Sequence, residues 1–126
     1  MAPELDKPIP TEVTLHRQSQ VLEVHFDDGA RFELPCEFLR VYSPSAEVKG
    51  HGPGQEVLVT GKETVNIAAI EPVGNYAVKL VFDDGHATGL YSWGYLYHLG
   101  RHQDRLWMDY LDALKKAGYQ RKAKTS

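Results

Sequence analysis

A hairpin pattern that occurs twice, 56 residues apart, limits what this 126-residue chain can fold into more than any other feature. Residues 21–29 (Val-Leu-Glu-Val-His-Phe-Asp-Asp-Gly) are echoed by residues 77–85 (Ala-Val-Lys-Leu-Val-Phe-Asp-Asp-Gly). Apolar and polar residues alternate in each copy, as in a strand with one buried face. Asp-Gly favours a tight turn, and a second extended stretch follows, ending at Leu34 or Leu90. We therefore predict two β-hairpins.

Each hairpin is followed by an aromatic-bearing helical pattern. Pro35 suits the first position of a short helix that stops before Pro44. In the second copy Ser92 is a candidate N-cap, and Gly100 is predicted to end the helix. The repeat is thus a strand–turn–strand–helix unit. The residues expected to face the core are Leu22, Val24, Phe26, Phe32 and Leu34 in the first copy, and Val78, Leu80 and Phe82 in the second.

The remaining segments complete an α+β fold, with a mostly antiparallel sheet built from two Phe-Asp-Asp-Gly hairpins, short helices and a C-terminal amphipathic helix. Further short strands are predicted at residues 11–16, 57–59 and 65–70. The C-terminal helix is predicted over residues 103–117, with Gly118 just beyond its end. We expect a flexible leader at 1–10, one domain at 11–118 and a basic disordered tail at 119–126.

Composition excludes several classes of protein. The formal charge of -3 gives no overall positive field for nucleic acid or an anionic membrane. The single cysteine, Cys36, excludes an intrachain disulfide and a cysteine-rich zinc motif. No apolar run is long enough to cross a bilayer, and the first ten residues lack a signal-peptide pattern. We expect a cytoplasmic protein without nucleic-acid or membrane partners.

Several motifs were weighed for chemistry. His25-Phe26-Asp27 matches half of the two-histidine, one-carboxylate iron site of oxygenases, although Asp27 is also explained as a turn residue. His98 and His102 have the i, i+4 spacing of a metal pair, but Gly100 is predicted to break the helix between them. His86 takes the place of Ala30 in the repeat and should face inward, either as a hydrogen-bonded core residue or as a ligand.

A family resemblance extends these inferences. It is carried by residues 26–29 (Phe-Asp-Asp-Gly), 34–35 (Leu-Pro), 38–40 (Phe-Leu-Arg), 43–48 (Ser-Pro-Ser-Ala-Glu-Val), 82–86 (Phe-Asp-Asp-Gly-His) and 91–93 (Tyr-Ser-Trp). As a set, these motifs resemble the N-terminal domain of γ-butyrobetaine hydroxylase, which also occurs as small stand-alone bacterial proteins of uncharacterised function. In the hydroxylases a separate barrel performs catalysis. That barrel is absent from this sequence, so the resemblance does not imply hydroxylase activity.

The resemblance also implies a metal position that this chain has altered. The family domain resembles a zinc module held by three cysteines and one histidine. His86 matches the histidine, whereas Ser43, Ser45 and Val48 lie where the cysteines would be. Hydroxyls are poor zinc ligands and valine is none, so these residues cannot form the tetrahedral site. The same domain also occurs as an appended module in proteins that resemble P-loop iron–sulfur cluster carriers.

The sequence is compatible with two functions. The first is a non-enzymatic binding or adaptor domain that presents a surface around residues 40–55 and the second hairpin to a protein partner. The second is a metal-binding protein (iron or zinc) or an iron–sulfur-assembly accessory protein that uses His86. No cofactor is expected under the first function. The predicted binding surface consists of Arg40, Ser43, Ser45, His51 and His86.

Overall fold

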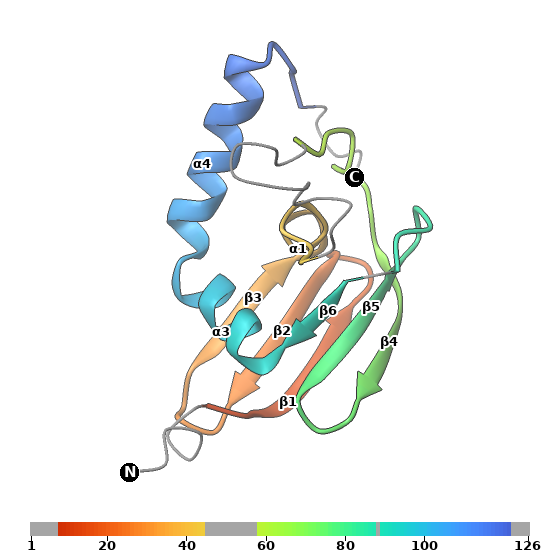
Figure 1. Ribbon diagram of the computed structural model, residues 1–126, viewed down its shortest axis with the longest axis vertical. Coiled ribbons are helices and arrows are strands. Elements are labelled where there is room, and N and C mark those ends of the chain that lie inside the picture. Colours follow the sequence, from red (N-terminus) through yellow and green to blue (C-terminus); the bar gives the residue numbers. More distant parts are fainter. Residues whose placement is uncertain (1–7, 45–57, 88, 122–126) are drawn as a thin grey trace.

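The protein folds into two three-stranded antiparallel sheets with helices at their ends (Figure 1). This computed structural model describes residues 8–44, 58–87 and 89–121. One sheet has the order β1-β2-β3 and the other the order β4-β5-β6. The elements are, in chain order, β1 (Pro10–His16), β2 (Val21–Phe26), β3 (Arg31–Pro35), α1 (Cys36–Val41), β4 (Ile67–Val73), β5 (Ala77–Phe82), β6 (Leu90–Ser92), α3 (Trp93–Arg101) and α4 (Gln103–Lys116). The predicted α+β class and both hairpins are confirmed. The return strand of the second hairpin was predicted to end at Leu90, which is wrong, because β6 starts at that residue.

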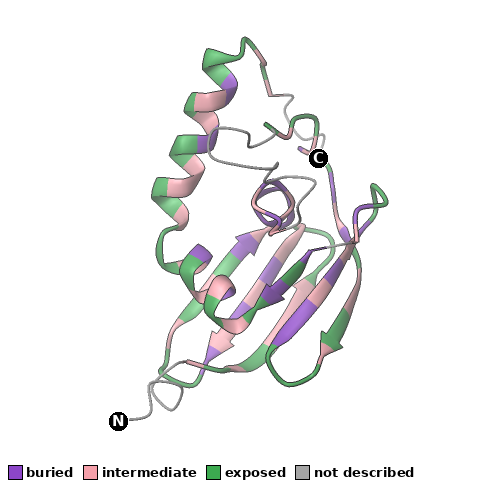
Figure 2. Ribbon diagram, in the orientation of Figure 1, coloured by how far each residue is buried: buried purple, intermediate pink, exposed green. Residues whose placement is uncertain are grey.

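Both sheets contribute their inner faces to one hydrophobic core. Burial is concentrated along β2, β5 and α1, whereas α4 is exposed over much of its length (Figure 2). Alternation places every second residue of β2 and β5 in this core, because successive side chains point to opposite faces. Of the predicted core residues, all are buried except Phe32, which is partly buried and packs against the core cluster.

The tips of the two hairpins have the same backbone structure. In each, the phenylalanine N–H bonds to the carbonyl of the residue after the turn, Ala30 or His86, at 2.9 Å. The second aspartate, Asp28 or Asp84, accepts from the backbone N–H of that same residue. The turn glycine has a φ of 89° in the first tip and 91° in the second, a left-handed conformation that glycine adopts readily.

The repeat continues beyond the turns into the helices. Leu34 lies opposite Leu22 in the first sheet, and Tyr91 lies opposite Val78 in the second. Equivalent residues on the return strands and helices are therefore 57 apart, one more than in the leading strands. The structure consists of two equivalent β-β-β-α halves, β1 to α1 and β4 to α3, followed by α4.

Most helix ends agree with their sequence signals. The hydroxyl of Ser92 accepts a hydrogen bond from the Tyr95 N–H at 3.2 Å, so Ser92 is the predicted N-cap of α3. Helix α4 spans Gln103–Lys116, close to the predicted range, and Gly118 follows it with a φ of 78°. Pro35 was predicted to be the first residue of the helix. It is instead the N-cap of α1, one position before the helix begins.

The prediction that Gly100 ends its helix is wrong. Helix α3 continues through Gly100 to Arg101. A Cβ at Gly100 would lie 2.3 Å from the ring of Phe32. Glycine is therefore required there for the close approach of α3 to β3, and not as a helix terminator.

The predicted strand at 57–59 is also wrong for its described residues, Leu58 and Val59, which lie in no strand. Strand β4 starts at Ile67, later than the predicted residue 65. Before β4, a side chain binds the backbone carbonyls that a neighbouring strand would bind in a sheet. Gln20 donates to the carbonyls of Thr64 and Val65 at 2.8 and 3.2 Å.

Residues 119–121, which were assigned to the disordered tail, are in contact with the rest of the fold. The Tyr119 hydroxyl donates to Glu63 at 2.8 Å. Arg121 forms a two-point ion pair with the buried carboxylate of Glu37. Its guanidinium also lies 5.2 Å from the ring centroid of Trp107. At the other end of the chain, Pro10 belongs to β1 and not to the leader. In the described part of the chain, every helix is too short or too polar to span a membrane.

Candidate functional site

The two halves of the fold differ at their hairpin tips, although the backbone there is the same. In the first tip, Oδ2 of Asp28, the carboxylate oxygen not bound to the turn, accepts from the Tyr97 hydroxyl of α3 at 2.6 Å. In the second tip, Oδ2 of Asp84 accepts from Arg40 Nε of α1 at 2.9 Å. Tyr97 and Arg40 are 57 residues apart and therefore occupy equivalent positions. Each tip carboxylate is thus held by the helix of the other half, by a neutral group in one case and by a cation in the other.

The first tip is closed by apolar packing. The ring of Phe32 lies against the backbone of Gly100 and makes edge-to-face contacts with Phe26 and Tyr97, at centroid distances of 5.8 and 5.5 Å. Ala30, the first residue after the turn, adds no polar group. This half of the repeat therefore shows what the fold requires at such a tip.

The second tip replaces these apolar groups with polar ones. His86 stands in the place of Ala30, and Ser43 in the place of Gly100. His86 is buried, and its Nε2 lies 2.9 Å from Ser43 Oγ, which is also buried. Ser43 in turn lies against Gly89. A Cβ at position 89 would be only 2.4 Å from Ser43 Oγ. Glycine at position 89 therefore makes room for the serine. We call Arg40, Ser43, Lys62, Asp84 and His86 the polar tip.

Two cations and one carboxylate give the polar tip an excess positive charge. Lys62 Nζ joins Arg40 on Asp84, at 2.6 Å. Burial alone would raise the pKa of Asp84, but hydrogen bonds from Lys62, the His86 N–H and Arg40 lower its pKa to about 2. Asp84 is therefore ionised at neutral pH. Only 11% of the Arg40 side chain is exposed, and its Nη1 is buried without a hydrogen-bond partner among the residues that the structure describes.

The structure brings three of the five predicted surface residues together. Arg40, Ser43 and His86 lie in the polar tip. Ser45 and His51 lie outside the described residues. Sequence reasoning missed Lys62, and it assigned Asp84 only to the turn. Extending the repeat into the helices with the one-residue change of offset would have paired Arg40 with Tyr97, but it would not have identified their acceptors.

The described residues of the polar tip do not fit the zinc ion that the family resemblance implies. His86 faces a serine hydroxyl, which is a poor zinc ligand. Arg40 and Lys62 add positive charge beside it. Residues 8–44, 58–87 and 89–121 contain no group of three or more His, Cys, Asp or Glu side chains able to hold a metal ion.

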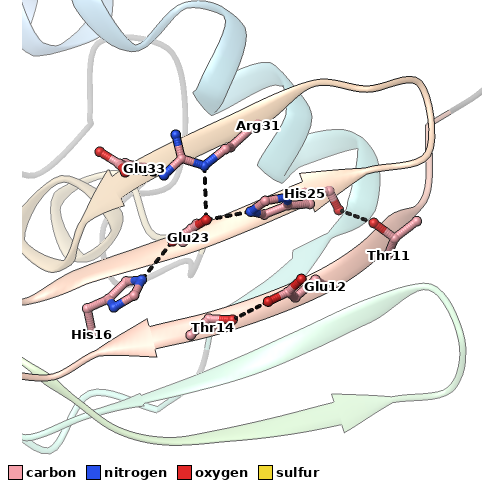
Figure 3. A network of polar contacts seen from close by, with 8 residues as sticks. All are labelled: Thr11, Glu12, Thr14, His16, Glu23, His25, Arg31 and Glu33. Atoms are coloured by element: carbon pink, nitrogen blue, oxygen red, sulfur yellow. Dashed lines mark hydrogen bonds and ion pairs between the residues drawn. The ribbon is translucent and has the colours of Figure 1, made fainter.

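The oxygenase motif considered in the sequence does not converge either. His25 points to the outer face of the first sheet, where its ring bonds to Glu23 (Figure 3). Glu23 also bonds to His16 at 2.7 Å and to Arg31 at 2.9 Å. These contacts, from His25, His16 and Arg31, lower the pKa of Glu23 to about 2. Asp27 is used at the turn, where it accepts from the Ile9 N–H.

The fold and the tips together define a class: small α+β domains made of two hairpin–helix units, one with an apolar tip and one with a polar tip. The chain belongs to the family described as gamma-butyrobetaine hydroxylase-like, N-terminal, whose model matches residues 13–97. The resemblance drawn from the Phe-Asp-Asp-Gly motifs is thus confirmed. No curated protein matches the chain.

Solved structures agree with this assignment. Two proteins with NMR solution structures are similar over almost the whole chain. The first is 56% identical with a TM-score of 0.80, and the alignment covers 99% of both chains. The second is 48% identical with a TM-score of 0.79, covering 95% of this chain and 94% of that one. A crystal structure from Acidithiobacillus ferrooxidans ATCC 23270 is 42% identical, with a TM-score of 0.61, and covers 72% of this chain and 91% of its own. It is described as a protein of unknown function in the DUF971 family.

Proposed function

We propose that this protein is a non-enzymatic binding or adaptor domain whose binding surface is centred on the polar tip. The observation that carries the proposal is the difference between the two halves. The same backbone is completed at the first tip by Ala30, Gly100 and Tyr97, and at the polar tip by His86, Ser43 and Arg40. Because the first half forms its tip without these polar groups, the fold itself does not call for them. A binding role accounts for their presence.

The charge of the polar tip favours an acidic group on the protein partner. Lys62 and Arg40 both pair with the carboxylate of Asp84, so these three side chains together carry one positive charge in excess. Arg40 Nη1 has no acceptor in the described part of the chain, and a buried donor without a partner costs about 1–3 kcal/mol. A carboxylate from the partner would supply the acceptor and balance the charge. Ser45 and His51, which follow in the chain, remain proposed members of this surface.

The protonation state of Asp84 supports binding over catalysis. A general acid or base works best when its pKa lies near the working pH. The pKa of Asp84 is lowered to about 2, so that this carboxylate stays ionised and paired near neutral pH. Its contacts with two cations suit a group that positions Arg40 and Lys62 and does not transfer protons.

The test is an affinity purification with the full chain as bait, comparing Arg40→Gln with Tyr97→Phe. Tyr97→Phe removes the hydroxyl that donates to Asp28, and Arg40→Gln replaces the cation that donates to Asp84 with a neutral amide, at equivalent positions of the repeat. We expect the wild-type partner to be retained by Tyr97→Phe and to bind at least about tenfold more weakly to Arg40→Gln. The free energy of unfolding of each variant establishes that both are folded.

Two results would contradict the proposal. Equal retention of the partner by both variants would show that Arg40 does not contribute to binding. Stoichiometric iron or zinc in tag-free protein, lost on His86→Ala, would instead favour the metal-binding alternative. Elemental analysis of the purified wild type and of this variant distinguishes the two functions.

A further inference from the structure

Two exposed histidines lie at the end of helix α3: His98 in its last turn and His102 at its C-cap. His98 and His102 have the i, i+4 spacing that places two imidazoles on one face of a helix, as in helical zinc motifs. Their ring centroids lie 4.9 Å apart. The sequence alone argued against this pair, because Gly100 lies between its members. The structure removes the objection, since α3 runs through Gly100 and His102 is its C-cap.

The helix holds both rings on a rigid base. The ring of Tyr95 stacks on His98 at a centroid distance of 6.3 Å. The His102 N–H bonds to the His98 carbonyl at 3.1 Å, which fixes the last turn. Leu99, between the two histidines, is buried in the core. A pair of ligands on a well-packed element needs little reorganisation to chelate an ion.

We propose that His98 and His102 form an open two-imidazole site for a divalent transition-metal ion. Imidazole nitrogen suits Cu²⁺, Ni²⁺ and Zn²⁺, and affinity for such a site is expected to be highest for Cu²⁺. The site goes beyond the proposed binding function and uses no residue of the polar tip. With two protein ligands, further coordination positions remain for water or for a donor from another molecule.

The surroundings of the pair influence which ions it accepts. Two cationic residues flank His102 in the sequence: Arg101 directly precedes it, and Arg105 follows it by three positions. The same arginines repel cations. Hard ions such as Mg²⁺ and Ca²⁺ prefer oxygen ligands and gain nothing here to offset that repulsion. The site therefore selects ions that bind nitrogen strongly.

The test uses the full chain without a histidine tag, titrated with Cu²⁺ and followed by electron paramagnetic resonance and calorimetry. We expect one ion per chain, with splitting from two nitrogens. His98→Ala and His102→Ala should each lower the affinity at least about tenfold and remove one nitrogen from the spectrum. His16→Ala is the matched control: it removes another exposed histidine, on β1, and should leave this binding unchanged.

Three results would overturn the proposal: absence of one-to-one binding, unchanged affinity in both variants, or loss of binding in His86→Ala. The last would place the ion at the polar tip. Both substituted histidines are exposed, so the variants are expected to fold. Circular dichroism of each variant checks this, and His98→Gln and His102→Gln provide polar replacements should either alanine variant unfold.

Discussion

Two glycines of helix α3 should respond to alanine in opposite directions. A Cβ at Gly100 would meet three carbons of the Phe32 ring, at 2.3, 2.4 and 2.7 Å, whereas a Cβ at Gly94 meets nothing within 4 Å. The Phe32 ring cannot move aside freely, because Phe26 and Tyr97 contact it edge-to-face. Gly100→Ala is therefore expected to strain the packing of α3 on β3, while Gly94→Ala only replaces a weak helix former.

The magnitudes follow from packing and helix propensity. Overpacking costs about 1–3 kcal/mol of stability. Three distances shorter than van der Waals contact place the packing cost of Gly100→Ala at the upper end, about 3 kcal/mol. Alanine returns about 1 kcal/mol of helix propensity, which leaves a net loss of about 2 kcal/mol. Gly94→Ala has no packing cost and should gain about 0.5 kcal/mol, since it lies in the first turn. At this chain length, about 1 kcal/mol shifts Tm by about 3–5 °C.

The assay is urea unfolding of both variants, followed by circular dichroism, with thermal unfolding as a second measurement. We expect Tm to fall by about 6–10 °C for Gly100→Ala and to rise by about 2 °C for Gly94→Ala. The reasoning would be refuted if Gly100→Ala were as stable as Gly94→Ala. In that case Gly100 would be an ordinary weak position of the helix and not a point of close contact.

Three further predictions concern stability. Ser92→Ala removes the acceptor of the Tyr95 N–H and should lower the free energy of unfolding by about 1 kcal/mol in denaturant titrations; no change would mean that Ser92 does not cap α3. Arg121→Gln leaves the Glu37 carboxylate, which is 4% exposed, without its cation. The same titrations should show a loss of about 2 kcal/mol in the free energy of unfolding, a value reduced because Arg121 is itself 30% exposed. Wild-type stability would show that this ion pair does not hold the C-terminal segment. The folded-state pKa of Glu23 is about 2, below its ordinary value of 4.5, so its stabilisation is present above pH 4.5 and is lost as the pH falls towards 2. Glu23→Gln should flatten the dependence of stability on pH in that window, and an unchanged slope would contradict this assignment.

The parts of the fold that the sequence predicted well depend on short-range patterns. Alternation defined the buried faces of β2 and β5, and Asp-Gly defined both turns, because these signals act over a few residues. Composition and the family motifs then sufficed for the fold class. His86 was expected to face inward from its place in the repeat, and it is buried.

The parts that the sequence did not predict depend on contacts between distant residues. Arg40 meets Asp84 across 44 residues, and Tyr97 meets Asp28 across 69. Nothing local to these side chains marks their partners. Gly100 is a similar case, since a glycine near the end of a helical pattern resembles a C-cap unless the position of the Phe32 ring is known.

Residues 58–59 and 65–66 were misassigned for the same reason. Apolar residues suggested that strands include these positions, yet the backbone here bonds to side chains from elsewhere in the chain. The Tyr110 hydroxyl of α4 donates to the Val59 carbonyl at 2.6 Å, and Gln20 binds the carbonyls of Thr64 and Val65. These bonds satisfy carbonyl groups that a neighbouring strand would otherwise have bound.

The most direct test of the account is to give the polar tip the residues of the first tip and to measure the free energy of unfolding. The variant combines Arg40→Tyr, Ser43→Gly and His86→Ala. If these three side chains serve recognition, the altered chain will still unfold cooperatively, within about 2 kcal/mol of the wild type. Loss of cooperative unfolding would show instead that they are needed to build the domain, and the proposed binding role would lose its main support.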